Sequence, residues 1–468
     1  MPQSVFVNTA PPATSVSSAL AQHVAHVQYE DLPPAVTEAA KTLMLDTLAA
    51  GWAGAGQAGV SEVGRTLAEV APPDHQNRQP SCRIWGGSSN APMLDAVFVN
   101  SAAAAALDFD PLHLEAVMHS QIMTVPALLA IAQQYGCSGR DFLTALALAD
   151  DINCRLAMSA QGHNGWFFTS IFGIFGTAAA CAKLMGGDRA VIQHALGIAL
   201  FQVAGTQQSM LEKSLTKRFM AAFAARGGAF SALLAMAGVT APAMPFEGRF
   251  GLSSLYQACN FDKTLHRLGD KFENGAVHIK KYPCCGCSHA LIEATLQLTA
   301  KYAIAISDVA GITIQISEFM NRMIGGEFSP DRQDPSVLAQ FNAKYAVACA
   351  LLRNRFELQD LEPSLVMDPA IARIAERITI TIDPLNDGEL VPAVVTLELV
   401  SGKILTQRID TFPGMTGAGC NVAELKKKVS SCLRAGPVPL DSAQIDRVFE
   451  RVSSIESNVN MTNFFSGF

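Results

Sequence analysis

The chain has 468 residues and a net charge of -7, and it is 16% charged and 49% hydrophobic. This length predicts two to three domains, and the apolar composition indicates much buried surface inside domains or between subunits. Because the sequence contains no long basic run, it lacks the cationic surface that nucleic-acid binding requires. We expect no nucleic-acid partner.

The eleven cysteines are scattered through apolar sequence, which is typical of free thiols in a reducing compartment. The first residues lack the pattern of a secretory signal and the arginine-rich character of a transit peptide. Apolar stretches are interrupted before ~20 residues accumulate, so we expect no membrane span. A cytoplasmic protein is predicted, or a mitochondrial one if the source is a eukaryote.

A large all-helical domain is predicted over 15–265, where apolar residues recur at helical spacing in segments such as AVTEAAKTLMLDTLAAGWAG. A smaller α+β domain is predicted over 266–408, and residues 409–468 return to helical patterns that we expect to fold back on the first domain. The predicted fold class is therefore mainly α. The strands expected in the smaller domain, from their two-residue alternation, are 311–317, 377–383 and 393–402, with helices at 286–303 and 335–353.

The segment LDFDPLHLEAVMHS, residues 107–120, is called the acidic segment below. Titratable groups are expensive to bury, so they are either solvated in a surface loop or held together for a purpose. A metal site is a further alternative, but the histidine spacing matches no standard metal pattern, and we predict no metal. The candidate side chains are Asp108, Asp110, His113, Glu115 and His119.

The segment SLTKRFMAAFAARGG, residues 214–228, carries a second candidate. In a helix, Lys217 shares a face with small residues, among them Ala221 and Gly228, which would leave room for a ligand beside the cation. The alternative is an exposed lysine at a helix start, which is commoner for any single lysine.

The segment HIKKYPCCGCSHALIEA, residues 278–294, contains a turn followed by a helix whose N-terminus suits anions. Cys284 and Cys287 have a CxxC spacing and His289 could add a third ligand, but no second pair completes a zinc site, so buried thiols are the favoured interpretation. The polar candidates around this helix start are Lys280, Lys281, Tyr282, Cys285 and His289.

Other stretches offer less. The segment SAQGHNGWFFTSIFG, residues 159–173, is more typical of core, and His163 is its titratable residue. The sequence has no GxGxxG in a strand–helix context and no GxxxxGK[ST], GxSxG or HExxH motif. Nucleotide-binding and common hydrolase interpretations therefore lose their support.

Taken in order, the motifs resemble those of the MmgE/PrpD family, which includes 2-methylcitrate dehydratase, cis-aconitate decarboxylase and iminodisuccinate epimerase. They are LDTLAAGWAGAG, NSAAAAALDFD followed by MHS, GWFFTSIFG, LTKRFMAAFAARGG, PFEGRFGL and KKYPCCGCSHALIEA. The resemblance implies a helical domain and an α+β domain with the active site between them. It also implies a homodimer that works on small di- or tricarboxylates without a metal or organic cofactor.

Carried over residue by residue, the resemblance implies catalytic roles for Asp108, His119, Lys217 and Lys280. An imidazole has a pKa near neutrality, as proton transfer next to a carboxylate requires. Substrate-binding contributions are expected from Asp110, His113, Arg218, Lys281, Tyr282 and Cys285.

Two positions depart from the family pattern. Phe167 stands where many members have histidine, and Cys285 stands where some decarboxylases have histidine. The leading hypothesis is a lyase that dehydrates or decarboxylates a citrate- or aconitate-like acid. The alternatives are an epimerase of an iminodisuccinate-like acid, which needs proton removal and return on opposite faces, and a homologue that binds a carboxylate without turnover.

Overall fold

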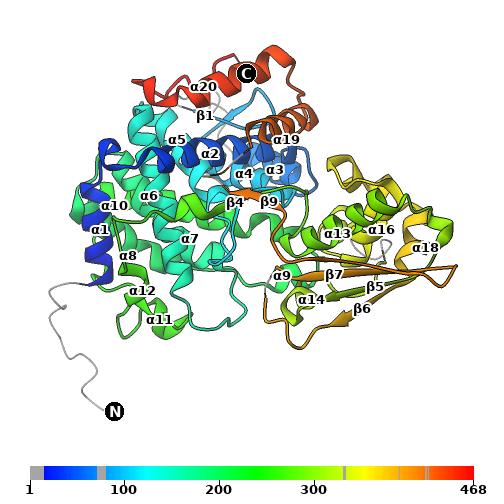
Figure 1. Cartoon of the computed structure of the whole chain (residues 1–468). Coiled ribbons are helices and arrows are strands. Elements are labelled where there is room, and N and C mark those ends of the chain that lie inside the picture. Colours follow the sequence, from blue (N-terminus) through cyan, green and yellow to red (C-terminus); the bar gives the residue numbers. More distant parts are fainter. Residues whose placement is uncertain are drawn as a thin grey trace.

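The computed structural model describes residues 15–70, 81–329, 334–388, 390–416, 419 and 421–467. A large helical part lies beside a smaller part that contains a four-stranded sheet (Figure 1). The predicted fold class, mainly α with an α+β part, is confirmed.

Side-chain caps are present at the start of several helices of the helical part. The side chains of Ser15, Ser138 and Asp188 accept hydrogen bonds from backbone N–H groups in the first turns of α1, α6 and α8. The helices of this part are α1 Val16–His26, α2 Pro34–Gly54, α3 Val60–Val70, α4 Met93–Ala106, α5 Gln121–Tyr135, α6 Gly139–Met158, α7 Phe168–Leu184, α8 Arg189–Ala199, α9 Gln208–Leu211, α10 Met220–Met236, α11 Leu252–Leu255 and α12 Phe261–Leu265, with short strands β1 Cys82–Arg83 and β2 Asn90–Ala91.

Helices α6, α7 and α10 approach one another closely at glycines. A Cβ on Gly228 would lie 2.9 Å from the Ile174 carbonyl oxygen, and one on Gly176 would lie 2.5 Å from the Ala149 carbonyl oxygen. The stretch Leu215–Met236, which includes α10, is long and apolar enough to cross a membrane by length and composition. Its packing against α4, α7 and α8 accounts for that composition, because 61% of its most apolar window is buried inside the protein.

The smaller part is built on a sheet with the strand order β6-β5-β7-β8. Strand β5 pairs in parallel with β6 and antiparallel with β7, which pairs antiparallel with β8. Helix α13 packs on β7 and β8, and α16 packs on α13 and α18. Three of the strands fall where alternation predicts them, and β8 is additional. The bounds are α13 Gly286–Tyr302, β5 Val309–Ile316, α14 Glu318–Ile324, α17 Pro363–Val366, α18 Pro369–Ala375, β6 Ile378–Ile382, β7 Ala393–Leu399 and β8 Ile404–Ile409.

The single helix predicted over 335–353 is wrong in one respect, because the chain breaks there into α15 Pro335–Gln340 and α16 Ala343–Arg353. Asn342 causes the break: its side chain accepts a hydrogen bond from the Tyr345 backbone N–H at 2.9 Å and so caps a new helix. Phe341 lies between the two helices.

A second, three-stranded sheet joins distant segments. Strand β4 (Val277–Lys280) lies between β3 (Leu112–His113) of the acidic segment and β9 (Gly414–Thr416), antiparallel to both. The C-terminal helices α19 (Val422–Ala435) and α20 (Ser442–Ser453) pack against α2, so the tail lies on the helical part (Figure 1). Strand pairing thus holds the acidic segment next to β4, the strand that carries Lys280.

Candidate active site

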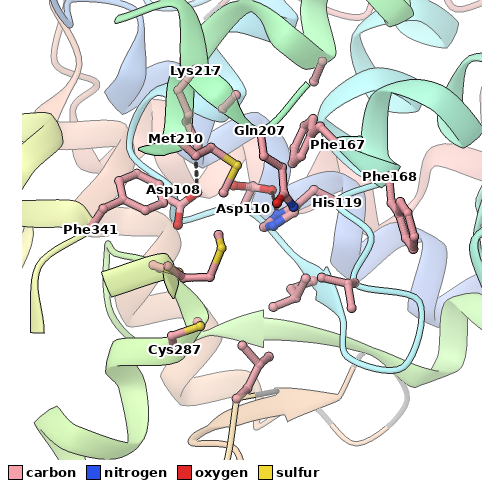
Figure 2. A pocket seen from close by; sticks show the side chains of 18 of the residues that line it. Asp108, Asp110, His119, Phe167, Phe168, Gln207, Met210, Lys217, Cys287 and Phe341 are labelled. Carbon is pink, nitrogen blue, oxygen red and sulfur yellow. Dashed lines mark hydrogen bonds and ion pairs between the residues drawn. The ribbon is translucent and has the colours of Figure 1, made fainter. Parts of the chain in front are cut away.

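A cavity of about 60 Å³ lies where the helical part meets the α+β part (Figure 2). The acidic segment, the start of α7 and the loop before α10 form one side of it. The start of α13, α14 and the break between α15 and α16 form the other. The predicted site residues that line it are Asp108, Asp110, His119, Lys217 and Cys285.

Asp108 is the centre of the charged cluster. It follows α4 with a φ of 50°, a left-handed conformation that aspartate tolerates better than most residues. Lys217 donates a hydrogen bond to its Oδ1, and Lys280 donates to its Oδ2 at 3.1 Å and to its backbone oxygen at 2.8 Å. Lys280 is fully buried, so it supports Asp108 from behind while Lys217 faces the cavity.

Burial and charge oppose each other in this cluster. Burial raises the pKa of Asp108, but the ammonium groups of Lys217 and Lys280 outweigh it and hold the pKa well below its usual range. Burial alone would lower the pKa of Lys280, but Asp108 and Asp110 raise it above the ordinary lysine value. The carboxylate and the buried ammonium are therefore both charged at neutral pH.

Asp110 and His119 form a second unit. The imidazole Nδ1 of His119 lies 2.7 Å from Asp110 Oδ2, and the His119 backbone N–H donates to Thr169 Oγ1 at 3.1 Å. Asp110 is buried, and although burial raises its pKa, the charges of His119 and Lys280 bring it below the usual value. A carboxylate on Nδ1 fixes the tautomer and leaves Nε2 for proton exchange with a ligand.

A buried polar network holds the helix that begins directly after His119. Asp150 of α6 accepts hydrogen bonds from Ser120 Oγ at 2.7 Å, Gln121 Nε2 at 2.8 Å and Thr124 Oγ1 at 3.0 Å. Burial raises the pKa of Asp150 to about 6, and these neutral donors offset only part of the shift. Asp150 thus positions the start of α5, and with it the backbone of His119.

Cys285 is the residue before α13 and lines the cavity. A hydrogen bond with Cys287 lowers the pKa of the Cys285 thiol and, together with the charge of Lys280, outweighs burial. Burial raises the pKa of the neighbouring Cys284 and Cys287 thiols well above the usual value. Cys285 is therefore the thiol of this turn with the greatest thiolate character.

The structure does not bring four of the predicted substrate-binding residues to the cavity. His113 is buried elsewhere, with Nε2 3.6 Å from a Glu273 oxygen. Arg218 is buried on another side of the helix start and donates to the Ala58 carbonyl oxygen. The side chains of His113 and Arg218 therefore contact groups that lie outside the cavity.

Lys281 and Tyr282 both point to a separate groove and bind Glu293 there, at 2.8 Å and 2.7 Å. The physical reason is the end of β4 at Lys280, because the chain bends there and no longer follows an extended strand. Lys280 Nζ binds Asp108, whereas Lys281 forms its ion pair with Glu293 outside the cavity.

His163 and Phe167 both line the cavity. His163 is exposed, stacks on Phe168 with ring centroids 4.5 Å apart, and has Nε2 3.2 Å from the Gln207 amide nitrogen. Phe167 lines the wall beside His119, with ring centroids 6.5 Å apart. An apolar ring thus occupies the wall where many family members were expected to place an imidazole.

Sequence patterns did not identify several wall residues. They come from loops and from α9, α13 and α14, where no periodic signal marks a site. In the described part of the chain, no group of three or more histidine, cysteine or acidic side chains could hold a metal ion. The unpredicted wall residues include Gln207, Met210, Cys287, Phe319, Met323 and Phe341.

Comparison with protein-family models places this cavity in a known context. Residues 18–262 match the MmgE/PrpD N-terminal domain, and residues 282–454 match the MmgE/PrpD C-terminal domain. The chain belongs to the MmgE/PrpD family. The cavity draws on both domains, since Asp108 and Lys217 come from the first match and Cys285 and the helix start at Gly286 come from the second.

Similar curated members of the MmgE/PrpD family are cis-aconitate decarboxylases or are named after them. The cis-aconitate decarboxylase-like protein oryM of Aspergillus oryzae is 24% identical, over 98% of each chain. The cis-aconitate decarboxylase of Aspergillus terreus is 26% identical over 72% of each chain. That of Homo sapiens is 23% identical over 88% of this chain and 87% of its own.

Proposed function

We propose that this member of the MmgE/PrpD family is a cofactor-independent lyase that decarboxylates a small tricarboxylate of the cis-aconitate type. The observation that carries the proposal is the Asp110–His119 pair, which faces the same cavity as Lys217. The names of the relatives favour decarboxylation over dehydration and over epimerisation.

In this proposal His119 supplies a proton. Decarboxylation breaks a carbon–carbon bond, releases carbon dioxide and leaves an electron pair on the substrate carbon. The imidazolium of His119 donates its Nε2 proton to that carbon and is reprotonated by water. Asp110 stabilises the imidazolium and keeps the ring aimed at the cavity, a contribution of the size that general acids typically make, roughly 100- to 10,000-fold.

Lys217 holds a substrate carboxylate in the proposed complex. Its ammonium group lines the cavity while Asp108 fixes its position. A fixed cation loses little freedom on binding and can orient the carboxylates relative to His119. Lys280, which is fully buried, keeps Asp108 charged and in place, so its role is to position the cluster.

The proposal is tested by proton NMR of the purified protein in deuterium oxide with cis-aconitate, citrate, 2-methylcitrate and iminodisuccinate. We expect cis-aconitate to lose carbon dioxide and to gain one deuterium on carbon, and His119→Asn to abolish both. Dehydration of citrate or 2-methylcitrate would identify a dehydratase. Deuterium exchange at an α-carbon of iminodisuccinate without bond cleavage would identify an epimerase, and no change across the panel would contradict turnover.

We also propose that the chain forms a homodimer through the outer face of α10. Phe223 and Phe230 lie two turns apart on this helix, and their side chains are 60% and 42% exposed. Large exposed rings on a mostly buried helix are typical of subunit interfaces. Light scattering behind size-exclusion chromatography should give a dimer mass, and Phe223→Asp should shift it toward the monomer.

A further inference from the structure

We infer that Lys213 is an additional substrate-binding residue, whose ammonium group receives a carboxylate that Lys217 does not hold. This inference rests on the proposed function of the cavity and extends it to a specific preference for three carboxylates over two.

Lys213 lies in the loop between α9 and the turn that carries Lys217, and it spans the boundary between the two parts of the molecule. Its Nζ donates to the Met323 carbonyl oxygen of α14 at 3.0 Å. Met323 lines the cavity, and so does Met210, whose carbonyl oxygen accepts a hydrogen bond from the Lys213 backbone N–H. Its backbone has a φ of 55°, a left-handed conformation that is unfavourable for a lysine.

Lys213 and Lys217 share one neighbour in the cavity wall. The Nζ atoms of Lys213 and Lys217 lie 5.6 Å and 4.7 Å from the centre of the Phe341 ring. Phe341 lines the cavity and is positioned there by the break between α15 and α16. The two ammonium groups therefore both lie next to one ring of the cavity wall (Figure 2 shows Phe341 and Lys217).

The charges of the cluster explain why a further cation is needed. Asp108 forms ion pairs with both Lys217 and Lys280, and Asp110 pairs with His119. Two carboxylates thus balance two lysines, which leaves little net positive charge for a substrate with three carboxylates. A further cation beside the cavity would strengthen the binding of such a substrate, because opposite charges attract more strongly near the protein interior than in bulk water.

Lys213 is suited to supply that charge. Among the described residues no carboxylate forms an ion pair with it, and its Nζ donates to a neutral carbonyl oxygen, that of Met323. Burial lowers the pKa of Lys213, and the Cys285 and Cys287 thiols oppose the shift. Exchange of the carbonyl for a substrate carboxylate would give a charge-assisted hydrogen bond, the stronger kind.

The inference is tested by calorimetric binding of two unreactive ligands, propane-1,2,3-tricarboxylate and propane-1,3-dicarboxylate, which differ by one carboxylate. Lys213→Met should weaken the tricarboxylate about 10- to 100-fold, the range of a charged hydrogen bond, and the dicarboxylate by less than about threefold. Lys213→Arg should restore most of the tricarboxylate affinity. Lys403→Met, which alters an exposed lysine next to β8, is the matched control and should change neither.

Three results would overturn the inference. If Lys213→Met binds the tricarboxylate as tightly as the unaltered chain, the inference alone fails. If it weakens both ligands equally and lowers the melting temperature, Lys213 is only a tether between the two parts. If the unaltered chain binds neither ligand, the proposed function fails as well. In the turnover assay we expect Lys213→Met to raise KM and to change kcat by less than about threefold.

Discussion

Two pairs of neighbouring cations, Lys217–Arg218 before α10 and Lys280–Lys281 at the end of β4, divide in the same way. The first member of each pair reaches Asp108, whereas Arg218 donates to a backbone carbonyl and Lys281 binds Glu293 in another groove. Positive charge in the sequence therefore does not become positive charge in the cavity. The local backbone sets the direction of each side chain, because β4 ends at Lys280 and because Lys217 and Arg218 lie in a tight 3₁₀ turn.

The histidines of the acidic segment extend this comparison and give the largest expected effect. His119→Asn should lower kcat by roughly 100- to 10,000-fold, because it removes the proton donor that Asp110 orients. His113→Asn should leave kcat within about threefold and lower thermal stability instead, since His113 is buried outside the cavity. Steady-state kinetics and circular dichroism melts measure both. Equal losses of kcat in the two folded variants would contradict the assignment of His119 to the cavity and of His113 to a position outside it.

The two lysines of the β4 end should differ sharply in stability. Lys280→Met leaves the buried Asp108 with one partner fewer and should lower the free energy of unfolding by about 3–5 kcal/mol. Lys281→Met removes a pair in which the lysine is 51% exposed, so solvent screening limits the loss to less than about 1 kcal/mol. Urea titration of the two variants is the measurement. A comparable loss for both would mean that Lys280 is not a buried support.

Asp108 faces cations and Asp150 faces only neutral donors, and this contrast predicts a pH dependence. The pKa of Asp150 is raised to about 6 in the folded chain, above its ordinary value of 3.8. Its contribution to stability is therefore full below about pH 4 and is lost as the pH rises toward 6, by about 3 kcal/mol from the shift. Asp150→Asn should remove that part of the slope.

The asparagine variant is expected to fold, because Gln121 Oε1 has no hydrogen-bond partner and can turn to accept from the new amide. Denaturant unfolding at pH 4 and pH 7 compares the slopes. If the variant keeps the full loss of stability between these pH values, Asp150 is not its source.

A third neighbouring pair gives the smallest expected effect. Cys285 lines the cavity and has a lowered thiol pKa, whereas Cys284 is fully buried and burial raises its pKa. Iodoacetamide should label Cys285 at least about 10-fold faster than Cys284, because the thiolate is the nucleophile. Mass spectrometry of timed samples measures both rates, and propane-1,2,3-tricarboxylate should slow the labelling of Cys285. Equal rates would contradict the assignment of Cys285 to the cavity wall.

Much of the architecture is predictable because the periodic signals are local. Alternation in the α+β part and helical spacing in the rest each depend on residues close in sequence. The predicted helix over 335–353 fails at Asn342, because a cap interrupts an otherwise helical pattern. The motifs that resemble the family predict Asp108 and His119, which lie within one short segment.

The remaining site residues depend on contacts that no local pattern contains. Lys213 and Met323 meet across the boundary between the two parts, and Phe341 enters the wall through a helix break. The Arg218 and Lys281 side chains point away from the cavity because of where one turn and one strand end lie in the sequence. A shift of the turn or of the strand end by a single residue would change which side chain faces Asp108. Counting the lysines and arginines of a motif therefore overstates the number of cations that face the cavity.

The most direct test of the division between neighbouring cations is the turnover of cis-aconitate by Lys217→Met beside Lys281→Met, both checked for folding by circular dichroism. Asp108 fixes Lys217 at the cavity, whereas Lys281 lies outside it. We predict that Lys217→Met loses at least about 100-fold in kcat/KM while Lys281→Met stays within about threefold of the unaltered chain. Retained turnover in a folded Lys217→Met variant would contradict the account.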